Sequence, residues 1–216
     1  MRYDTTGIVL VSRYLQIHPE NPQRRLIAQA VDVLRAGGVI VYPTDSAYAL
    51  GCRIGDKAAM DRIRAIRRLD ETHNFTLVCR DLSELSIYAQ VSNPSYRLLR
   101  THTPGPYTFI LRATPEVPRR LMHPKRKTIG MRVPDNAIAL ALLDALNEPM
   151  MSVTLILPGE DLPMTDPEEI RDRLGHALDL VIDGGGCGLE PTTVVDLAGD
   201  IPVVIRRGKG DPSAFE

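Results

Sequence analysis

The chain has 216 residues, of which 44% are apolar and 25% charged, the composition of an ordinary globular protein with one sizeable core. No run approaches the roughly 18 apolar residues of a membrane helix, and the N-terminal segment is too polar for a signal peptide, so we expect a cytoplasmic protein without a membrane partner. The formal net charge is -1, and three scattered cysteines with five scattered histidines predict buried free thiols and no metal site.

The first predicted elements are a helix and two short strands. Residues 21–38 predict a helix with Asn21 as its N-cap and Pro22 at the first helical position. Apolar runs at 39–43 and 47–52 predict strands. The polar residues 43–46 between them form an elbow, which is either an ordinary connection or a ligand contact.

The remaining elements mix strands and helices without a strict β-α-β alternation. In chain order they are a helix at 56–68, a strand at 74–79, a helix starting at Ser92 or Asn93, strands at 107–113 and 128–134, a helix at 136–148, a strand at 149–157, a helix at 167–175 capped by Asp166, and strands at 178–185, 192–197 and 201–208. This order predicts one α/β or α+β domain with a mixed, twisted sheet. Ligands of such sheets usually lie beyond the strand ends.

Candidate chemistry rests on hydroxyls and cations, because the sequence contains no phosphate-binding glycine loop, nucleophile elbow or zinc-protease motif. Three hydroxyl pairs fall at strand ends: Thr44 with Ser46, Ser152 with Thr154, and Thr192 with Thr193. Taken singly, each pair is more typical of a turn or sheet edge than of a ligand contact.

Positive charge is concentrated in the first part of the chain. Residues 1–132 carry 21 Lys and Arg against 11 Asp and Glu, whereas residues 133–216 carry 5 against 16. The cations form one cluster within residues 62–68 and another within 119–132. The positive electrostatic potential of such clusters favours binding of phosphate, in a nucleotide or in RNA. A solvated basic surface balanced by an acidic one is the alternative, and composition alone slightly favours it.

Five segments in register resemble the YrdC-like family of threonylcarbamoyl-AMP synthases. They are "GGVIVYPTDSAYALGC", "TPGPYTFIL", "TIGMRVPDNAIALALL", "EPMMSVTL" and "PTTVVDL". The resemblance covers residues 21–210, leaving 1–20 as an N-terminal extension and 211–216 as a C-terminal tail. It implies a single α/β (α+β) domain, with a twisted mixed sheet flanked by helices and a large concave basic cleft.

The resemblance also implies an activity, in which threonine, bicarbonate and ATP with Mg²⁺ give threonylcarbamoyl-AMP and pyrophosphate for a tRNA modification. ATP and Mg²⁺ are then substrates, and no tightly bound cofactor or catalytic side chain is implied. The residues it marks as substrate-binding are Thr44, Arg132, Ser152 and Thr193. Those it marks as nucleotide-binding are Arg67, Thr154, Thr192 and Arg206, although Arg206 is equally well read as a strand-end surface arginine.

The sequence departs from the family pattern at three of these places. A Lys-x-Arg motif is replaced by Arg67-Arg68-Leu69, an Asn by Thr154, and a Ser by Thr192. An arginine and a lysine hold phosphate differently, because one is a planar fork and the other a compact ammonium. Together with "IHPENPQ" and "HNFTLVCRDLSELS", this pattern resembles the YciO branch of the family.

Three functions remain open from the sequence. One is the adenylate-forming enzyme. Another is an enzyme that adenylates or carbamoylates a different small molecule. The remaining one is a double-stranded RNA or tRNA-binding protein that uses the same basic cleft. Its predicted phosphate contacts are Arg62, Arg64, Arg68, Arg119, Arg120, Lys125, Arg126 and Lys127. Because only 5% of residues are aromatic, such binding would read phosphate and duplex shape rather than bases.

Overall fold

The computed structural model describes residues 12–70 and 73–216, in which eleven strands form one mixed sheet. The strands are β1 (Arg13–Gln16), β2 (Ile40–Tyr42), β3 (Ala49–Arg53), β4 (Thr76–Val78), β5 (Ala89–Gln90), β6 (Tyr107–Ala113), β7 (Thr128–Arg132), β8 (Met150–Thr154), β9 (Leu180–Asp183), β10 (Thr193–Asp196) and β11 (Val203–Arg206). Their spatial order is β1-β9-β2-β3-β8-β4-β7-β6-β10-β11, with β5 paired to β6. Parallel pairs such as β4 with β7 adjoin antiparallel pairs such as β3 with β8, which confirms the predicted mixed sheet.

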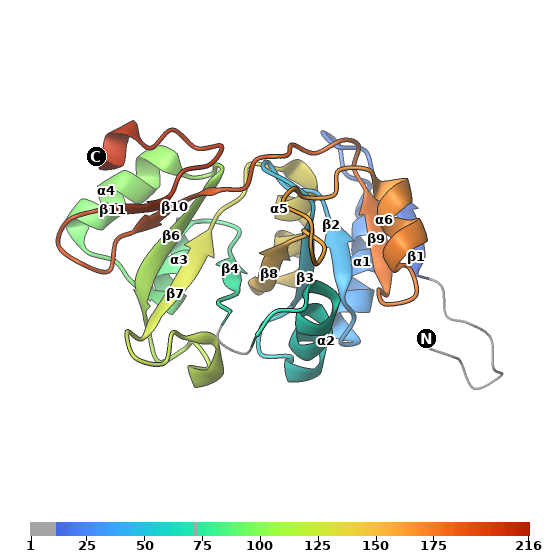
Figure 1. Cartoon of the computed structure of the whole chain (residues 1–216), viewed down its shortest axis with the longest axis horizontal. Helices are drawn as coiled ribbons and strands as arrows, with labels where there is room; N and C mark the ends of the chain where they lie inside the picture. The colour runs from blue at the N-terminus through green and yellow to red at the C-terminus, as the bar shows by residue number, and fades with distance from the viewer. Residues whose placement is uncertain (1–11, 71–72) are drawn as a thin grey trace.

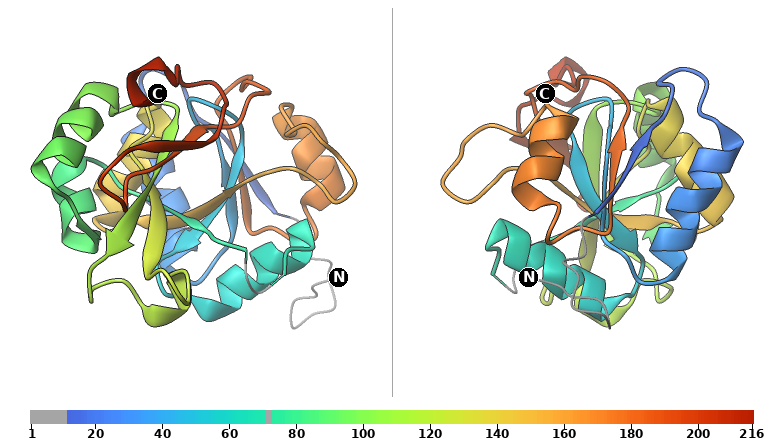
Figure 2. Two further views of the ribbon diagram at one scale, coloured as in Figure 1. Left: turned by 60° about the vertical axis from the view of Figure 1, so that its left-hand side comes forward. Right: turned by 90° about the vertical axis from the view of Figure 1, so that its right-hand side faces the viewer.

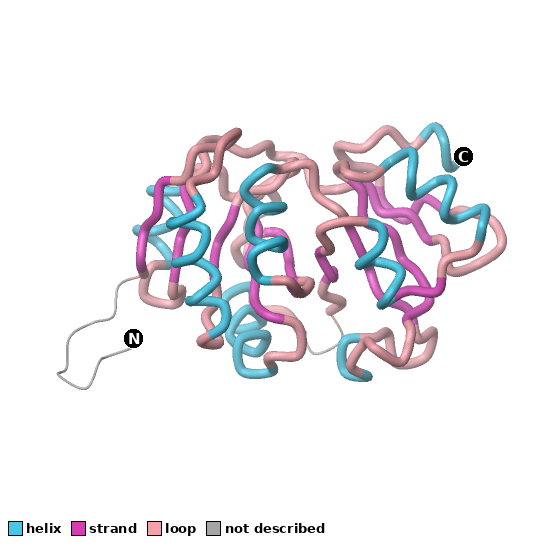
Figure 3. Tube along the Cα trace, turned by 180° about the vertical axis from the view of Figure 1, so that it is seen from behind, coloured by secondary structure: helices cyan, strands magenta, loops and turns pink. Residues whose placement is uncertain are grey.

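Helices cover both faces of this sheet. They are α1 (Arg24–Arg35), α2 (Lys57–Arg67), α3 (Leu82–Tyr88), α4 (Asn93–His102), α5 (Ala137–Leu146) and α6 (Pro167–Leu174), with 3-10 turns η1 (Arg119–Leu121) and η2 (Ser213–Phe215). Helices α2 and α6 lie in front of the sheet in Figure 1, and α1 and α5 lie on its opposite face (Figure 2). Seen from behind, α1, α5, α3 and α4 form a row across the sheet (Figure 3). No helix among the described residues is long and apolar enough to cross a membrane.

Helix α5 is the most apolar helix, and it anchors the rear layer. Its residues Ile138, Leu142 and Leu143 are fully buried against strands of the sheet and against α1. The side chain of Asn136 caps the helix by accepting a hydrogen bond from the backbone N–H of Ala139 (3.0 Å). This element therefore forms where the sequence predicts it.

The start of α1 differs from the prediction, since Gln23 rather than Asn21 occupies the N-cap. The reason lies in the preceding turn. Nδ1 of His18 accepts hydrogen bonds from the backbone N–H groups of Glu20 (3.2 Å) and Asn21 (3.1 Å), which commits Asn21 to the turn. The side-chain oxygen of Gln23 accepts from the N–H of His18, so the helix begins only at Arg24.

Both ends of the chain contribute to the fold. The predicted N-terminal extension includes β1, which pairs in parallel with β9, and the predicted C-terminal tail places Phe215 in the main core. Strands β1 and β5 and helix α3 were not predicted from the sequence. Buried free thiols were predicted for all three cysteines, but Cys187 is only half-buried because it lies on the loop between β9 and β10.

Candidate functional site

A cleft of about 270 Å³ crosses strands β8, β4, β7, β6 and β10. Its polar lining residues are Thr44, Ser46, His73, Asn74, Thr76, Thr108, His123, Arg126, Thr128, Arg132, Ser152, Thr154, Thr192 and Arg206. Within the described residues, this lining contains three arginines, two histidines and no carboxylate. The cleft is thus a cationic, hydroxyl-rich site suited to an anionic ligand.

The elbow after β2 is organised by the hydroxyl of Thr44. Its Oγ1 donates to the carbonyl of Ala47 (2.6 Å) and accepts from the backbone N–H groups of Ser46 and Ala47 (3.2 Å each). Thr44 is only 6% exposed, and its Oγ1 also lies 3.1 Å from Oγ of Ser46. The hydroxyl therefore shapes the turn that carries it as well as facing the cleft.

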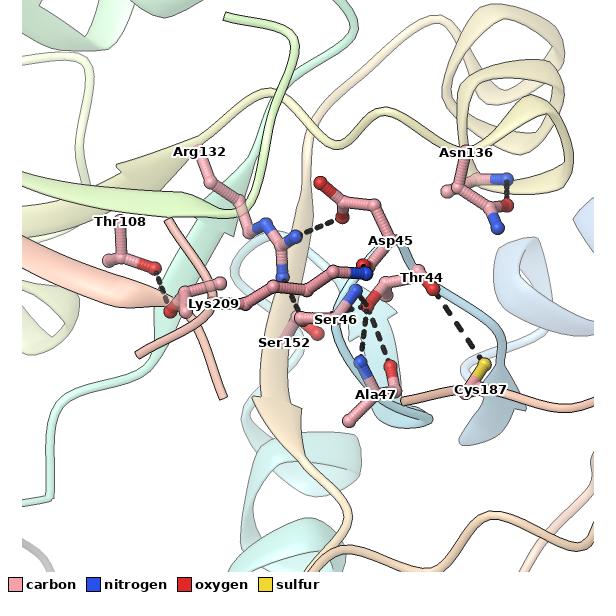
Figure 4. Close-up of polar contacts among 12 residues, drawn as sticks. Thr44, Asp45, Ser46, Ala47, Thr108, Arg132, Asn136, Ser152, Cys187 and Lys209 are labelled. Atoms are coloured by element: carbon pink, nitrogen blue, oxygen red, sulfur yellow. Dashed lines mark hydrogen bonds and ion pairs between the residues drawn. The ribbon is translucent and has the colours of Figure 1, made fainter. Parts of the chain in front are cut away.

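Arg132 reaches from the end of β7 to this elbow (Figure 4). Its Nη2 forms an ion pair with Oδ1 of Asp45, and its Nη1 donates to Oγ of Ser46 (3.3 Å). Nε of Arg132 and Oδ2 of Asp45 are buried and have no hydrogen-bond partner within the described residues. From the C-terminal segment, Nζ of Lys209 donates to the carbonyl of Asp45 (2.5 Å).

Ser152 is held at the floor of the cleft by two hydrogen bonds. Its Oγ accepts from the hydroxyl of Tyr42 (2.8 Å) and donates to the carbonyl of Leu50 (3.1 Å). Burial raises the pKa of the Tyr42 phenol, so this donor stays protonated. By contrast, the hydroxyl of Thr154, two residues further along β8, makes no hydrogen bond in the part of the chain that is described. Thr154 therefore has its full bonding capacity for a ligand.

The hydroxyls of Thr192 and Thr193 point in different directions. Thr192 lines the cleft, where its Oγ1 lies 2.8 Å from that of Thr108. Arg206, the exposed last residue of β11, donates from Nη2 to the carbonyl (2.8 Å) and Oγ1 (3.2 Å) of Thr192. Thr193, which starts β10, is fully buried and donates to the carbonyl of Gly210. Its hydroxyl thus fixes the C-terminal segment.

Six of the eight residues that the family resemblance marks line the cleft, and Thr193 and Arg67 do not. Arg67 is the last residue of α2 and is half-buried. Its Nε has no hydrogen-bond partner in the described residues, and burial lowers its pKa. The structure thus brings together Arg132 of β7, Ser152 and Thr154 of β8, Arg206 of β11, Thr44 after β2 and Thr192 before β10.

Two histidines of the lining were not identified from the sequence. Nδ1 of His123 accepts from the backbone N–H groups of Lys125 (3.3 Å) and Arg126 (3.1 Å), so the neutral ring carries its proton on Nε2. The His-Pro pair at 123–124 makes the same turn as the His-Pro pair at 18–19, and this repetition was the available signal. The pKa of His73 is lowered by burial and, secondarily, by Arg67.

The cations predicted to bind RNA divide into two groups. Four have partners: Arg62 with Asp179, Arg64 with Asp61, Arg120 with the carbonyl of Gly55, and Arg126 with Asp196. The other four are exposed and have no side-chain partner among the described residues: Arg68, Arg119, Lys125 and Lys127. Arg62 donates to the carbonyl of Ala177 (2.9 Å) and is not part of the cleft lining.

The fold and much of the sequence match known proteins. A family model described as Telomere recombination, covering Sua5, YciO and YrdC, matches residues 32–208. The chain is 65% identical over 206 residues to a protein of Haemophilus influenzae and 62% identical over 205 residues to YciO of Escherichia coli. Each alignment covers 95% of this chain and 100% of the relative.

Solved structures give the same picture. The crystal structure of E. coli YciO superposes with a TM-score of 0.92 at 62% identity, over 95% of this chain and 100% of that one. The crystal structure of P. abyssi Sua5 complexed with L-threonine has a TM-score of 0.83 at 24% identity. That match covers 91% of this chain and 58% of Sua5, and it shows a shared fold.

Proposed function

The chain belongs to the Sua5/YciO/YrdC family, and on that premise we propose that its cleft joins L-threonine, bicarbonate and ATP with Mg²⁺ into threonylcarbamoyl-AMP. Threonine and bicarbonate condense to a carbamate with loss of water. The carbamate oxygen then attacks the α-phosphate of ATP, and pyrophosphate leaves. Such phosphoryl transfer depends mainly on positioning and on stabilising negative charge.

The lining of the cleft is the observation that supports this proposal, because it offers three arginines and several hydroxyls, of which Arg132 and Arg126 also pair with Asp45 and Asp196 outside the lining. Arg132 and Arg206 would hold phosphate or carboxylate oxygens, since guanidinium groups bind both in a forked geometry. The hydroxyls of Thr154 and Thr192 would orient the substrate. Mg²⁺ would arrive on the phosphates of ATP and needs no protein cage.

Threonine as the amino-acid substrate has its own support. P. abyssi Sua5, whose fold this chain shares, has been solved with L-threonine bound. In this chain the buried Oδ2 of Asp45 and Nε of Arg132 lie in one ion pair without further partners. An amino acid carries both an ammonium donor and a carboxylate acceptor, so it complements both groups.

The direct test is to incubate the purified chain with radiolabelled bicarbonate, threonine, ATP and Mg²⁺, and to measure adenylate and pyrophosphate. We expect product with the parent and with Arg100→Ala, a change at an exposed arginine of α4 outside the cleft. Arg206→Met should reduce it, because it removes a cation from the lining. A parent that forms no adenylate at high protein concentration would disprove the synthase activity.

RNA binding is a second candidate, favoured by the exposed Lys125 and Lys127, which have no side-chain partner in the described residues. The cations would neutralise phosphates and release counterions, so affinity should fall steeply as salt rises. Charge reversal of Lys125 and Lys127 together should weaken binding of double-stranded RNA. Binding that is insensitive to salt, or to that change, would exclude this function.

A further inference from the structure

A second cavity, of about 280 Å³, adjoins the cleft. The segment His73, Asn74 and Phe75 lines both and forms the wall between them. On its other sides, the second cavity is lined by Met60, Arg64, Arg119, Arg120, Leu121, Met122 and Pro124. Three arginines, from α2 and η1, therefore line this solvent-open cavity, and no carboxylate lies in the described lining.

The charges of these arginines are incompletely neutralised. Arg64 donates from Nη1 to Oδ1 of Asp61 (3.0 Å), but Asp61 also pairs with Lys57. Nε of Arg64 is buried and has no hydrogen-bond partner within the described residues. Arg120 donates only to a neutral carbonyl, that of Gly55. The three arginines of this lining thus share one carboxylate, that of Asp61, so an anion that enters the cavity meets unneutralised positive charge.

The geometry of Arg64 is fixed before any ligand arrives. Its guanidinium lies 5.1 Å from the centre of the Phe75 ring, within the range of a cation–π contact. Phe75 itself is buried in the main core, so this support is rigid. Arg119, by contrast, is exposed and has no side-chain partner among the described residues. One cation is therefore held in place and another is available to close over a ligand.

We propose that this cavity binds a phosphate group. Guanidinium groups bind phosphate through paired N–H donors, and the apolar side chains of Met60, Leu121 and Met122 lower the local dielectric and strengthen that attraction. The phosphate comes either from a free anion or from the end of a ligand whose remainder lies in the cleft. The second source rests on the proposed function, and the first is independent of it.

The test is a calorimetric titration of inorganic tripolyphosphate into the parent and into Arg119→Ala. We expect saturable binding to one site, weakened about tenfold by the loss of one charge-assisted contact. The matched control is Arg97→Ala, which removes an exposed arginine of α4 that lies outside both cavities. Equal weakening by both variants would show a nonspecific charge effect and overturn the proposal.

Further titrations separate the sources of the phosphate. If ATP blocks tripolyphosphate and Arg119→Ala also weakens ATP, the phosphate belongs to a ligand of the cleft. If ATP and tripolyphosphate bind together, the cavity takes a free anion. Loss of tripolyphosphate binding in Arg206→Met but not in Arg119→Ala would place the anion in the cleft and overturn the proposal. If the parent binds tripolyphosphate but neither threonine nor ATP, the proposed synthase function is excluded and the phosphate site remains.

Discussion

Arg132 on β7 and Asp45 in the elbow after β2 form an ion pair in which each side chain is less than a tenth exposed. The two residues are 87 positions apart, so the pair connects distant segments of the chain across the cleft (Figure 4). Arg132 was expected to bind an anionic group of a substrate, and its guanidinium already holds the carboxylate of Asp45. An anionic ligand must therefore compete with Asp45 or use the remaining Nε of the guanidinium.

Asp45→Asn should destabilise the protein, because it leaves Arg132 buried without a counter-charge. Removing one partner of a buried pair costs about 3–5 kcal/mol, which we take as an upper bound since asparagine keeps one acceptor. Urea unfolding measures the change. The double variant Asp45→Leu/Arg132→Met removes both charges and should recover most of the loss. A single variant as stable as the parent would mean that the pair contributes little to folding.

Thr44→Val should lower both stability and ligand affinity, because the Thr44 hydroxyl makes three hydrogen bonds within the elbow. Leaving these buried groups unpaired should cost about 1–3 kcal/mol in unfolding free energy. Thr44→Ser is the matched control, since it keeps the hydroxyl, and it should stay close to the parent. Thermal melting and threonine titration on the same samples give both values. Valine and serine variants with equal stability would contradict this role.

The sequence predicts the elements better than it predicts the contacts between side chains. Helix α5 follows directly from its apolar run and the cap at Asn136. The sequence does not predict which way the Thr193 side chain points. Thr192 and Thr193 carry the same hydroxyl, and the pairing of β10 with β6 decides which of them faces the cleft. The ion pair of Asp45 with Arg132 is also absent from any local pattern, since partners so far apart in the chain meet only through the sheet.

Glu84→Gln should remove a pH dependence of stability. Glu84 is 4% exposed, and burial raises its pKa above the ordinary value. The folded state therefore holds this proton more tightly than the unfolded state, so stability falls as pH rises from about 4.3 through the raised pKa. Glutamine keeps an acceptor for the N–H of Arg80 and has no charge. Unfolding free energy measured from pH 4 to 7 should lose that downward slope.

Parallel stability curves for the parent and Glu84→Gln would show that the carboxyl titrates normally. Asp81→Asn is a suitable companion, because Asp81 caps the same helix through the N–H of Glu84 but is more exposed. It should weaken the helix start without flattening the slope, which separates a capping effect from a titration effect.

His123→Asn should keep the loop between β6 and β7 and still weaken ligand binding. Asparagine can accept the backbone N–H groups of Lys125 and Arg126 as Nδ1 of His123 does, because its side-chain oxygen forms equivalent turns. It lacks the Nε2–H that the imidazole carries at the lining of the cleft. His123→Ala should lose both the hydrogen bonds that hold the turn and the contact with the ligand. The comparison needs melting temperatures and ATP titrations, and equal ATP affinity in the parent and the Asn variant would make His123 purely structural.

Leu69→Arg tests why this chain departs from the synthase pattern. Leu69 follows the left-handed Arg68 at the end of α2 and is only half-buried, so a longer cation can reach solvent without entering the core. Restoring that charge beside Arg67 should raise ATP affinity about tenfold, since a charge-assisted contact to phosphate contributes about 1.5–3 kcal/mol. Arg67→Ala should lower it, and Arg68→Ala, at an exposed position, is the control. Melting curves come first, because a destabilised Leu69→Arg would show that the leucine packs. A variant that melts like the parent but gains no ATP affinity would show that the missing arginine does not explain the departure, and would favour RNA or another small molecule as the ligand.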